Sequence, residues 1–548
     1  MSEETHQANR QIARASGTVM FAFALSQIAG LVRQILVTHT FGTGAAIDAF
    51  TAANAYPNLI FSLVAGGALA SAFVPTFAGL LAKGDKSGAW RLAASITNLI
   101  LLILAVLSLV SAIFAPQIVN RLLVPGFSPS QQALTAQLLR ILLISATVFG
   151  ISGLMMGILN AYQRFLLPSL TSTMYWSGLI IGLLFFVPSM GILGLAWGAV
   201  LGSLLHLAIQ LPDLLRLPDR RYTPTFGLGD PTVREVAILM GPRLFSVAAV
   251  QLSLLVNNRI ASHLPTGSVF APPAAFQIMT VPVFVIGSAI GTASLPTFSA
   301  QFARGAIDEM RQSFSATLRG ILLLSIPATV GLILLRVPLI AFLFQHGAFD
   351  AHSTQQVAWA LFWYTLGLVF FTVVEILTRA FFAMHNTWIP VIVGVVAMAA
   401  TIAFSFLFVD WFGQIGWMPL GGVALAASVG QAIETIALFF LLRRKLNGVN
   451  GSTLLQSAAI ALIGCVPMAG ILLGWSWFLD GQTKALTTIG NALHLSGTTF
   501  QAGVITLGGV LLGGMVYGLT LFALRVPEIH QVLTAVKQRL FKKLQAPV

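Results

Sequence analysis

Two charged residues stand inside an almost wholly apolar stretch near the amino end of the chain. Between Leu25 and Phe77 the sequence carries Arg33 and Asp48. A charge placed within a hydrophobic span is costly and commonly marks a functional site. Arginine offers a permanently charged, fork-shaped donor that fits a phosphate better than lysine does. We therefore predict that Arg33 binds a phosphate, and that Asp48 pairs with it until an anionic substrate competes for the arginine.

Each of these residues also has an ordinary explanation. Arg33 lies roughly 25 Å into a helix that begins near residue 16, so its guanidinium could reach the outer membrane interface. Asp48 opens the next predicted helix, where the helix dipole alone favours a carboxylate. Both explanations stay open at this point.

The composition places the chain in one broad class. Hydrophobic residues make up 57% of it and charged residues 8%, against about 25% charged in soluble domains. We predict an all-α polytopic membrane protein, because apolar runs long enough to span a bilayer recur along the whole length. The fourteen expected spans are 16–39, 47–80, 91–115, 133–161, 167–188, 191–212, 236–262, 274–300, 315–344, 356–384, 387–409, 418–443, 455–479 and 498–525. Pro57 and Pro327 should bend or interrupt the second and the ninth span.

The placement of basic residues predicts the orientation. The net charge is +13, but the lysines and arginines gather in alternate loops, which indicates membrane topology and no nucleic-acid partner. By the positive-inside rule both termini are cytoplasmic. The last residues, 527–548, read as an amphipathic helix lying on anionic lipid.

An internal repeat suggests the architecture. Residues 66–84 and 287–305 share eight identities in nineteen positions, including Pro-Thr-Phe and a basic residue followed by glycine. The shift of 221 residues predicts two six-helix repeats in the same orientation plus two extra carboxy-terminal helices. The expected parts are an amino-terminal lobe 1–222, a carboxy-terminal lobe 223–447, the extra helices in 448–526 and the tail. Transporters built from such repeats bind substrate between the halves.

Several stretches together carry a family resemblance. They are "GLVRQILVTHTFGTGAAIDAF", "YPNLIFSLVAGGALASAFVP", "GILNAYQRFLLP", "QLSLLVNN", "GTASLPTFS", "LFQHGAF" and "AFFAMHNTWIP". On these the chain resembles the MurJ (MviN) lipid II flippases of the multidrug/oligosaccharidyl-lipid/polysaccharide exporter superfamily. The resemblance implies that the protein moves an undecaprenyl-pyrophosphate-linked peptidoglycan precursor from the inner to the outer leaflet of the bacterial cytoplasmic membrane by alternating access. It also implies that the two extra helices accommodate the polyprenyl tail.

The sequence departs from that family where charges line the family's cavity. Neutral Gln27 and Gln277 stand where the resemblance implies arginine. Since a pyrophosphate carries at least two negative charges, Arg33 alone leaves part of it uncompensated. We expect Arg243 and Arg259, both on the span 236–262, to supply charge. Asn257, Gln27 and Gln277 should act as neutral donors to the substrate. The alternative is that both arginines reach out to the membrane interfaces and Asn257 only packs helices together.

Two acids in the later spans are candidates for ion coupling. Glu434 has no basic neighbour one helical turn away, and a lone acid within a bundle is a functional candidate by default. Gln431 could instead satisfy it. Glu375 stands four residues before Arg379, the spacing of an intrahelical ion pair. Transport could be driven by Na⁺, H⁺ or the membrane potential.

Other classes are disfavoured. The single cysteine, Cys465, excludes an intrachain disulfide, and neither a nucleotide-binding loop nor a hydrolytic triad is present. We therefore expect no enzyme, no metal and no cofactor, and a monomer whose partners are membrane lipids and a lipid-linked anionic substrate. Two alternatives to the flippase remain, namely an exporter of another lipid-linked saccharide or small amphipath, and a non-transporting membrane scaffold.

Overall fold

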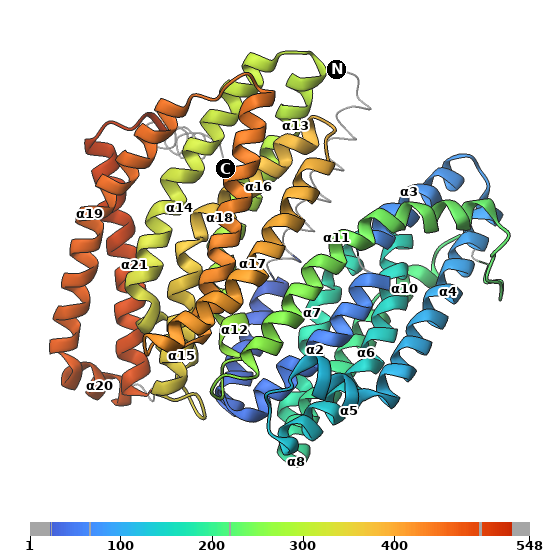
Figure 1. The fold of residues 1–548 in the computed structure, drawn as a ribbon, viewed down its shortest axis with the longest axis horizontal. Helices are drawn as coiled ribbons and strands as arrows, with labels where there is room; N and C mark the ends of the chain where they lie inside the picture. Colours follow the sequence, from blue (N-terminus) through green and yellow to red (C-terminus); the bar gives the residue numbers. More distant parts are fainter. Residues whose placement is uncertain (1–21, 23–24, 65–66, 219–220, 493–495, 529–548) are drawn as a thin grey trace, which may run out of the picture. The chain divides into compact units, whose positions relative to one another are not determined.

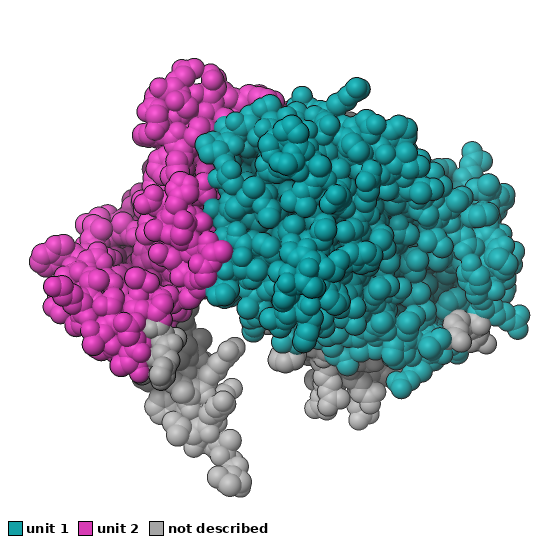
Figure 2. Space-filling model, turned by 90° about the horizontal axis from the view of Figure 1, so that it is seen from below, with its two compact units in different colours: residues 1–270 teal, residues 271–548 magenta. Residues whose placement is uncertain are grey.

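The computed structural model describes residues 22, 25–64, 67–218, 221–492 and 496–528, and every regular element in that part of the chain is helical (Figure 1). The helices fall into two compact units, residues 1–270 and 271–548, which are coloured separately in Figure 2. The amphipathic helix expected over 527–548 lies almost wholly outside the described residues.

The first unit begins with helical residues 25–41. The longer helices that follow are α2 (Ala45–Val64), α3 (Gly67–Ala82), α4 (Lys86–Ile113), α6 (Pro129–Ala161), α7 (Leu166–Ile181), α9 (Ile192–Ala208) and α11 (Pro231–Ala261). Short elements connect them, namely α5 (Ala115–Ile118), α8 (Val187–Met190), α10 (Leu211–Leu215) and the π-helical segments η1 (Val119–Leu123) and η2 (Gly182–Phe186).

The second unit holds the remaining helices. They are α12 (Ala271–Pro282), η3 (Val283–Ser288), α13 (Ala289–Ala303), α14 (Ile307–Phe344), α15 (Ala351–Leu366), α16 (Leu368–Ala383), α17 (Trp388–Gln414), α18 (Leu420–Lys445), α19 (Gly451–Gly481), α20 (Thr483–Ala492) and α21 (Gly497–Ala523).

The apolar helices match most of the expected spans. Among the described residues, ten helical segments are long and apolar enough to cross a membrane, and the bent pair α15 and α16 makes an eleventh. These correspond to expected spans three to six and eight to fourteen, which confirms a polytopic all-α membrane protein. The full count of fourteen stays a prediction.

Proline did not break the spans where the sequence suggested it would. Pro57 lies inside α2 and Pro327 inside α14, and both helices continue through these residues. The described part of the second span consists of α2 and α3, and residues 65–66 lie outside the described residues. Neither proline therefore interrupts its helix, and the bend expected as the other outcome stays a prediction.

A break that the sequence analysis missed lies at Gly367. Here the span formed by α15 and α16 bends by 47°. The Ser428 hydroxyl on α18 donates to the backbone carbonyl of Trp363, 2.7 Å away, which satisfies a group that the broken helix leaves without a partner. A Cβ at position 367 would lie 2.7 Å from the Ser428 oxygen. Only glycine therefore lets α18 approach so closely.

The two copies of the repeat share the same turns. Gly84 follows α3 with φ +78° and Gly305 follows α13 with φ +68°. In each turn the glycine N–H donates to the carbonyl three residues back, and the next N–H donates to the carbonyl five residues back. This is the Schellman pattern that ends helices. Gln163 and His385, 222 positions apart, repeat it with φ 58° and 55°. The superposition of six helices on six stays a prediction.

Helix α11 belongs to the first compact unit. The contact-based boundary falls between Phe270 and Ala271, whereas the repeat suggested a lobe boundary at 222/223. The difference arises because α11 packs against α2 and α3. One of the contacts is a 2.8 Å hydrogen bond from the Gln251 amide on α11 to the Ser62 hydroxyl on α2.

Two contacts fasten the extra carboxy-terminal helices to α14. The Tyr517 hydroxyl on α21 donates to the Leu323 carbonyl at 2.7 Å. Arg319 on α14 forms an ion pair with Glu528, just beyond α21. The core between these helices includes the buried side chains of Leu335 and Leu472.

Replacing Gly84 by alanine should lower the free energy of unfolding by the same amount as replacing Gly305. A Cβ at Gly84 or Gly305 would meet no other atom within 4 Å, so G84A and G305A should each lose only about 1–2 kcal/mol of backbone energy. G320A, within α14 and equally free of neighbours, should be neutral or stabilising. Thermal unfolding of the purified variants measures this, and unequal losses for G84A and G305A would contradict the shared turn.

Candidate functional site

The guanidinium of Arg33 stacks on an indole. Arg33 belongs to the helical residues 25–41, and its Cζ lies 4.7 Å from the ring centroid of Trp176 on α7. The indole also packs against Gly30, one turn earlier, where a Cβ would lie 3.4 Å from the indole nitrogen, at van der Waals contact. The Nε of Arg33 is buried and has no hydrogen-bond partner. The indole thus contacts one face of the Arg33 guanidinium, while the Nε–H at its edge is not used in a hydrogen bond.

Arg33 lines a cavity of about 280 Å³ within the first unit. The other lining residues are Val37, Phe50, Asn54, Asn58, Phe61, Phe149, Tyr175, Trp176, Leu179 and Leu195. The polar members offer a cationic fork, two carboxamides and a phenol, and none of these described lining residues carries a carboxylate. Such a set suits an anion, since every polar side chain can donate a hydrogen bond.

Helical spacing explains how the sequence builds this lining. Phe50, Asn54 and Asn58 follow one another at four-residue intervals on α2, so they share one face. Tyr175 and Trp176 are neighbours on α7, with ring centroids 4.9 Å apart. Phe149 on α6 contacts the Tyr175 ring edge-on at 5.0 Å. The cavity is therefore an aromatic box with polar groups on two sides.

A hydrogen-bonded group stands behind the aromatic wall. His206 on α9 contacts Phe149 edge-on, with centroids 5.1 Å apart. Its Nδ1 lies 2.6 Å from the Ser152 hydroxyl, which also accepts a 2.7 Å hydrogen bond from the Gln210 amide. Because these partners fix the imidazole, they also fix the ring that lines the cavity.

Asp48 lies away from this cavity lining, against backbone amides. Its side chain is buried, and its carboxylate accepts hydrogen bonds from the N–H groups of Gly267 at 2.6 Å and Phe270 at 2.8 Å. No ion pair joins it to Arg33 in the part of the chain that the structure describes. The pairing of the two residues was therefore wrong. Through these hydrogen bonds Asp48 instead links the 262–270 loop to α2.

Of the other residues predicted to bind substrate, Gln27, Gln277, Asn257 and Arg259 are not among the described residues that line this cavity. Gln27 is exposed on the helical residues 25–41, and Gln277 is partly buried on α12 of the second unit. Asn257 is partly buried on α11. Arg243 lies within α11. Arg259 is exposed at the end of α11, where its guanidinium donates to the Arg121 carbonyl. Their roles in binding stay predictions.

The two acids proposed for ion coupling both have partners. Glu375 forms an ion pair with Arg379 at 3.0 Å, one turn along α16, as the spacing predicted. Glu434 on α18 accepts a 3.2 Å hydrogen bond from the Gln431 amide, the simpler of its two explanations. A role for either in ion coupling is not tested by these contacts.

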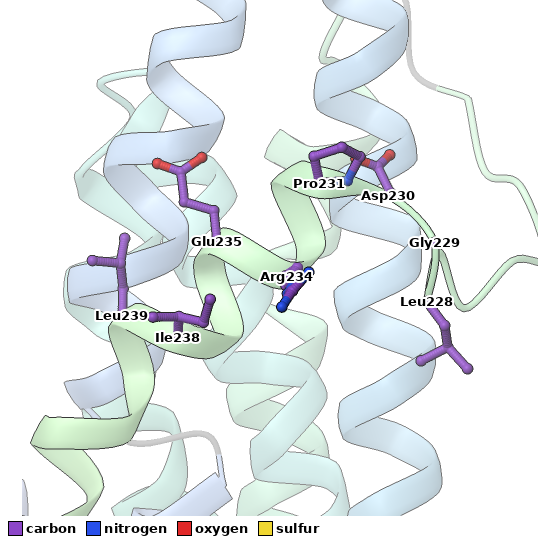
Figure 3. Close-up of a pocket in the computed structure, with 8 residues that line it drawn as sticks. All are labelled: Leu228, Gly229, Asp230, Pro231, Arg234, Glu235, Ile238 and Leu239. Carbon is purple, nitrogen blue, oxygen red and sulfur yellow. The ribbon is translucent and has the colours of Figure 1, made fainter.

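A second, shallower cavity of about 480 Å³ lies at the start of α11 (Figure 3). Its residues come from the loop before the helix and from one exposed face of the first turns, and they include Arg234 and Glu235. Asp230 caps the helix, and the hydrogen bond from the Thr232 hydroxyl holds the pKa of its carboxyl below the usual range. This arrangement starts a helix and does not single out a ligand.

Sequence reasoning found Arg33 but missed its surroundings. Asn54, Asn58, Tyr175 and Trp176 look like ordinary residues of apolar helices. The one signal available was the interval of four between the two asparagines in a span that otherwise holds few carboxamides. Trp176 stands more than 140 positions after Arg33, so only the fold brings them together.

The comparisons with known proteins settle the family. The model of the family described as "Lipid II flippase MurJ" matches residues 37–489. The chain belongs to the MurJ family. A protein of Burkholderia cenocepacia described as "Lipid II flippase MurJ" is 31% identical over 443 residues, which cover 79% of this chain and 84% of that protein. A "Probable lipid II flippase MurJ" of Vibrio cholerae is 29% identical and covers 90% and 96%.

Solved structures support the fold. One described as "Lipid II flippase MurJ, inward closed conformation" matches with a TM-score of 0.74 at 23% identity, over 92% of this chain and 99% of that one. An inward-facing MATE family transporter of the MOP superfamily matches with a TM-score of 0.66 at 16% identity, over 79% and 96%. The chain is thus a multi-pass protein of the bacterial inner membrane with the MurJ fold.

Replacing Asp48 by asparagine should loosen the 262–270 loop. An asparagine keeps one acceptor oxygen but turns a donor toward the second backbone amide, which costs about 1–3 kcal/mol for a buried group. Hydrogen exchange of peptides covering residues 265–271 should therefore be about 5- to 150-fold faster in D48N.

D350N is the matched control for this measurement. Asp350 caps α15 by accepting from the Ser353 N–H at 2.8 Å, and asparagine caps helices about as well as aspartate. Exchange at 265–271 should therefore be unchanged in D350N. Unchanged exchange in D48N as well would show that Asp48 does not hold this loop.

Proposed function

We propose that this protein flips lipid II, the undecaprenyl-pyrophosphate-linked peptidoglycan precursor, from the inner to the outer leaflet. Membership of the MurJ family supports the substrate, and the donor-lined cavity at Arg33 supports the recognition of its diphosphate. The observation that carries this proposal is a stacked guanidinium whose Nε has no hydrogen-bond partner, beside a cavity with no carboxylate among its described lining residues. The protein acts as a transporter and not as an enzyme.

Alternating access supplies the movement in this proposal. The shared turns of the two repeats support two structurally related halves, and such halves can expose a site to each side of the membrane in turn. One elementary charge crossing 100 mV is worth about 2.3 kcal/mol. A membrane potential that is positive outside therefore favours outward movement of the anionic diphosphate, with or without coupling to Na⁺ or H⁺ at Glu434 or Glu375.

Arg243 and Arg259 complete the charge balance in the proposal. One arginine leaves a penalty of several kcal/mol for the second buried phosphate. The two residues lie on α11, 16 positions apart, or about 24 Å along the helix. Arg243 therefore serves the inward-facing state and Arg259 the outward-facing state.

Two other functions stay as alternatives. An exporter of a different lipid-linked saccharide or amphipath is favoured by Gln27 and Gln277, because both lack charge where the family resemblance implies arginine. A non-transporting scaffold needs no substrate site at all. Rescue of a bacterium depleted of its own lipid II flippase separates the proposed function from both, since only a lipid II flippase restores growth.

The Arg33 side chain should be necessary for transport. R33A should lower the lipid II flipping rate at least about 100-fold, and R33K about tenfold, because the ammonium keeps the charge but loses the two-pronged geometry. The measurement is flipping by the purified protein in proteoliposomes. R140A is the matched control, since Arg140 is exposed on α6 and donates to the Ala112 carbonyl, outside the cavity. Equal rates in all four proteins would exclude the phosphate role.

Both termini should be cytoplasmic, and the protein should work as a monomer. Single cysteines placed at Tyr222 and Gln131 in a Cys465→Ser background test the orientation, because the basic residues put the first loop inside the cell and the second outside. A membrane-impermeant thiol reagent should label only the Gln131→Cys variant in intact cells. Labelling of Tyr222→Cys would overturn the orientation.

A further inference from the structure

The carboxamides of the Arg33 cavity carry an inference about substrate selection, which rests on the proposed function. Asn54 and Asn58 line the same cavity as Arg33, one helical turn apart on α2. Among the described residues, no hydrogen bond involves the side chain of Asn54 or of Asn58. Two unoccupied carboxamides beside a cation are a ready set of donors for a second anionic group.

The stacking on Trp176 determines which groups of Arg33 can bind a phosphate. The indole covers one face of the guanidinium, with the Cζ 4.7 Å from the ring centroid. A stacked guanidinium keeps its N–H groups in the ring plane, free to take one phosphate by its edge. Arg33 alone therefore binds a monophosphate as well as one end of a diphosphate.

The size of the cavity limits what can enter. At about 280 Å³ it is smaller than the pockets of roughly 300–1,000 Å³ that enclose drug-sized ligands. A disaccharide with a peptide cannot fit, whereas a diphosphate can. The cavity therefore recognises the phosphates, and the sugar and peptide lie elsewhere.

We propose that Asn54 and Asn58 are specificity-determining residues that select a diphosphate over a monophosphate, and that Trp176 is a positioning residue for Arg33. The first phosphate takes the edge of the guanidinium. The second accepts hydrogen bonds from the two carboxamides. A polyprenyl monophosphate, which lacks the second group, leaves both carboxamides unused and binds more weakly.

Binding of inorganic pyrophosphate and orthophosphate to the purified full-length chain tests this proposal. Calorimetry at fixed ionic strength should give tighter binding of pyrophosphate. The double variant N54A/N58A should lower this preference about 5- to 100-fold, at roughly 2- to 10-fold for each neutral hydrogen bond, and leave orthophosphate affinity within about twofold. N491A, which removes an exposed carboxamide on α20, should leave both affinities unchanged.

Variants of the stacked pair separate this proposal from the proposed function. R33A should lose both anions. W176A should weaken both by a similar factor, and W176F, which keeps an aromatic face, should recover most of that loss. An unchanged pyrophosphate preference in N54A/N58A, with both anions still lost in R33A, would overturn only the role of the asparagines. Full binding of both anions by R33A would instead remove the phosphate role of Arg33 on which the proposed function rests.

Discussion

The binding site depends on one positive charge in an apolar setting, Arg33, which forms no ion pair with any described residue. A buried ion costs several kcal/mol unless a partner compensates it, and the contact between Arg33 and Trp176 returns only about 0.5–2 kcal/mol. The deficit leaves the cavity ready for an anion. A carboxylate in the cavity would pair with Arg33 and compete with an anionic ligand. Asp48 does not compete for Arg33, because the N–H groups of Gly267 and Phe270 already occupy its oxygens.

The fold supplies the precision that this arrangement needs. Arg33, Asn54 and Trp176 come from three helical segments, and each is placed by helical spacing on its own segment. The Trp176 ring packs against the helical residues 25–41 at Gly30. The bond between His206 and Ser152 fixes the aromatic wall from behind. Rigid neighbours keep the edge of the guanidinium directed while the substrate is absent.

Much of the fold could be predicted from the sequence, because burial in lipid leaves a strong, local signal. Apolar runs predicted the spans, and the basic residue and glycine that end both repeated stretches correspond to the matching turns at Gly84 and Gly305. The bend at Gly367 could not be predicted, since it depends on Ser428 from a distant helix. Arg33 could be recognised in the sequence because it is a charge in an apolar span. Trp176 could not be recognised as part of the site, because only the fold brings it next to Arg33. The pairing with Asp48 failed because backbone amides, which leave no trace in a sequence, were the better partners.

The most direct test is a structure of the full-length protein with a bound polyprenyl diphosphate. One phosphate should lie within about 3 Å of the Arg33 guanidinium nitrogens, the usual length of a charged hydrogen bond. The second phosphate should face Asn54 and Asn58. A diphosphate bound elsewhere, with Arg33 still stacked on Trp176 beside an empty cavity, would contradict it.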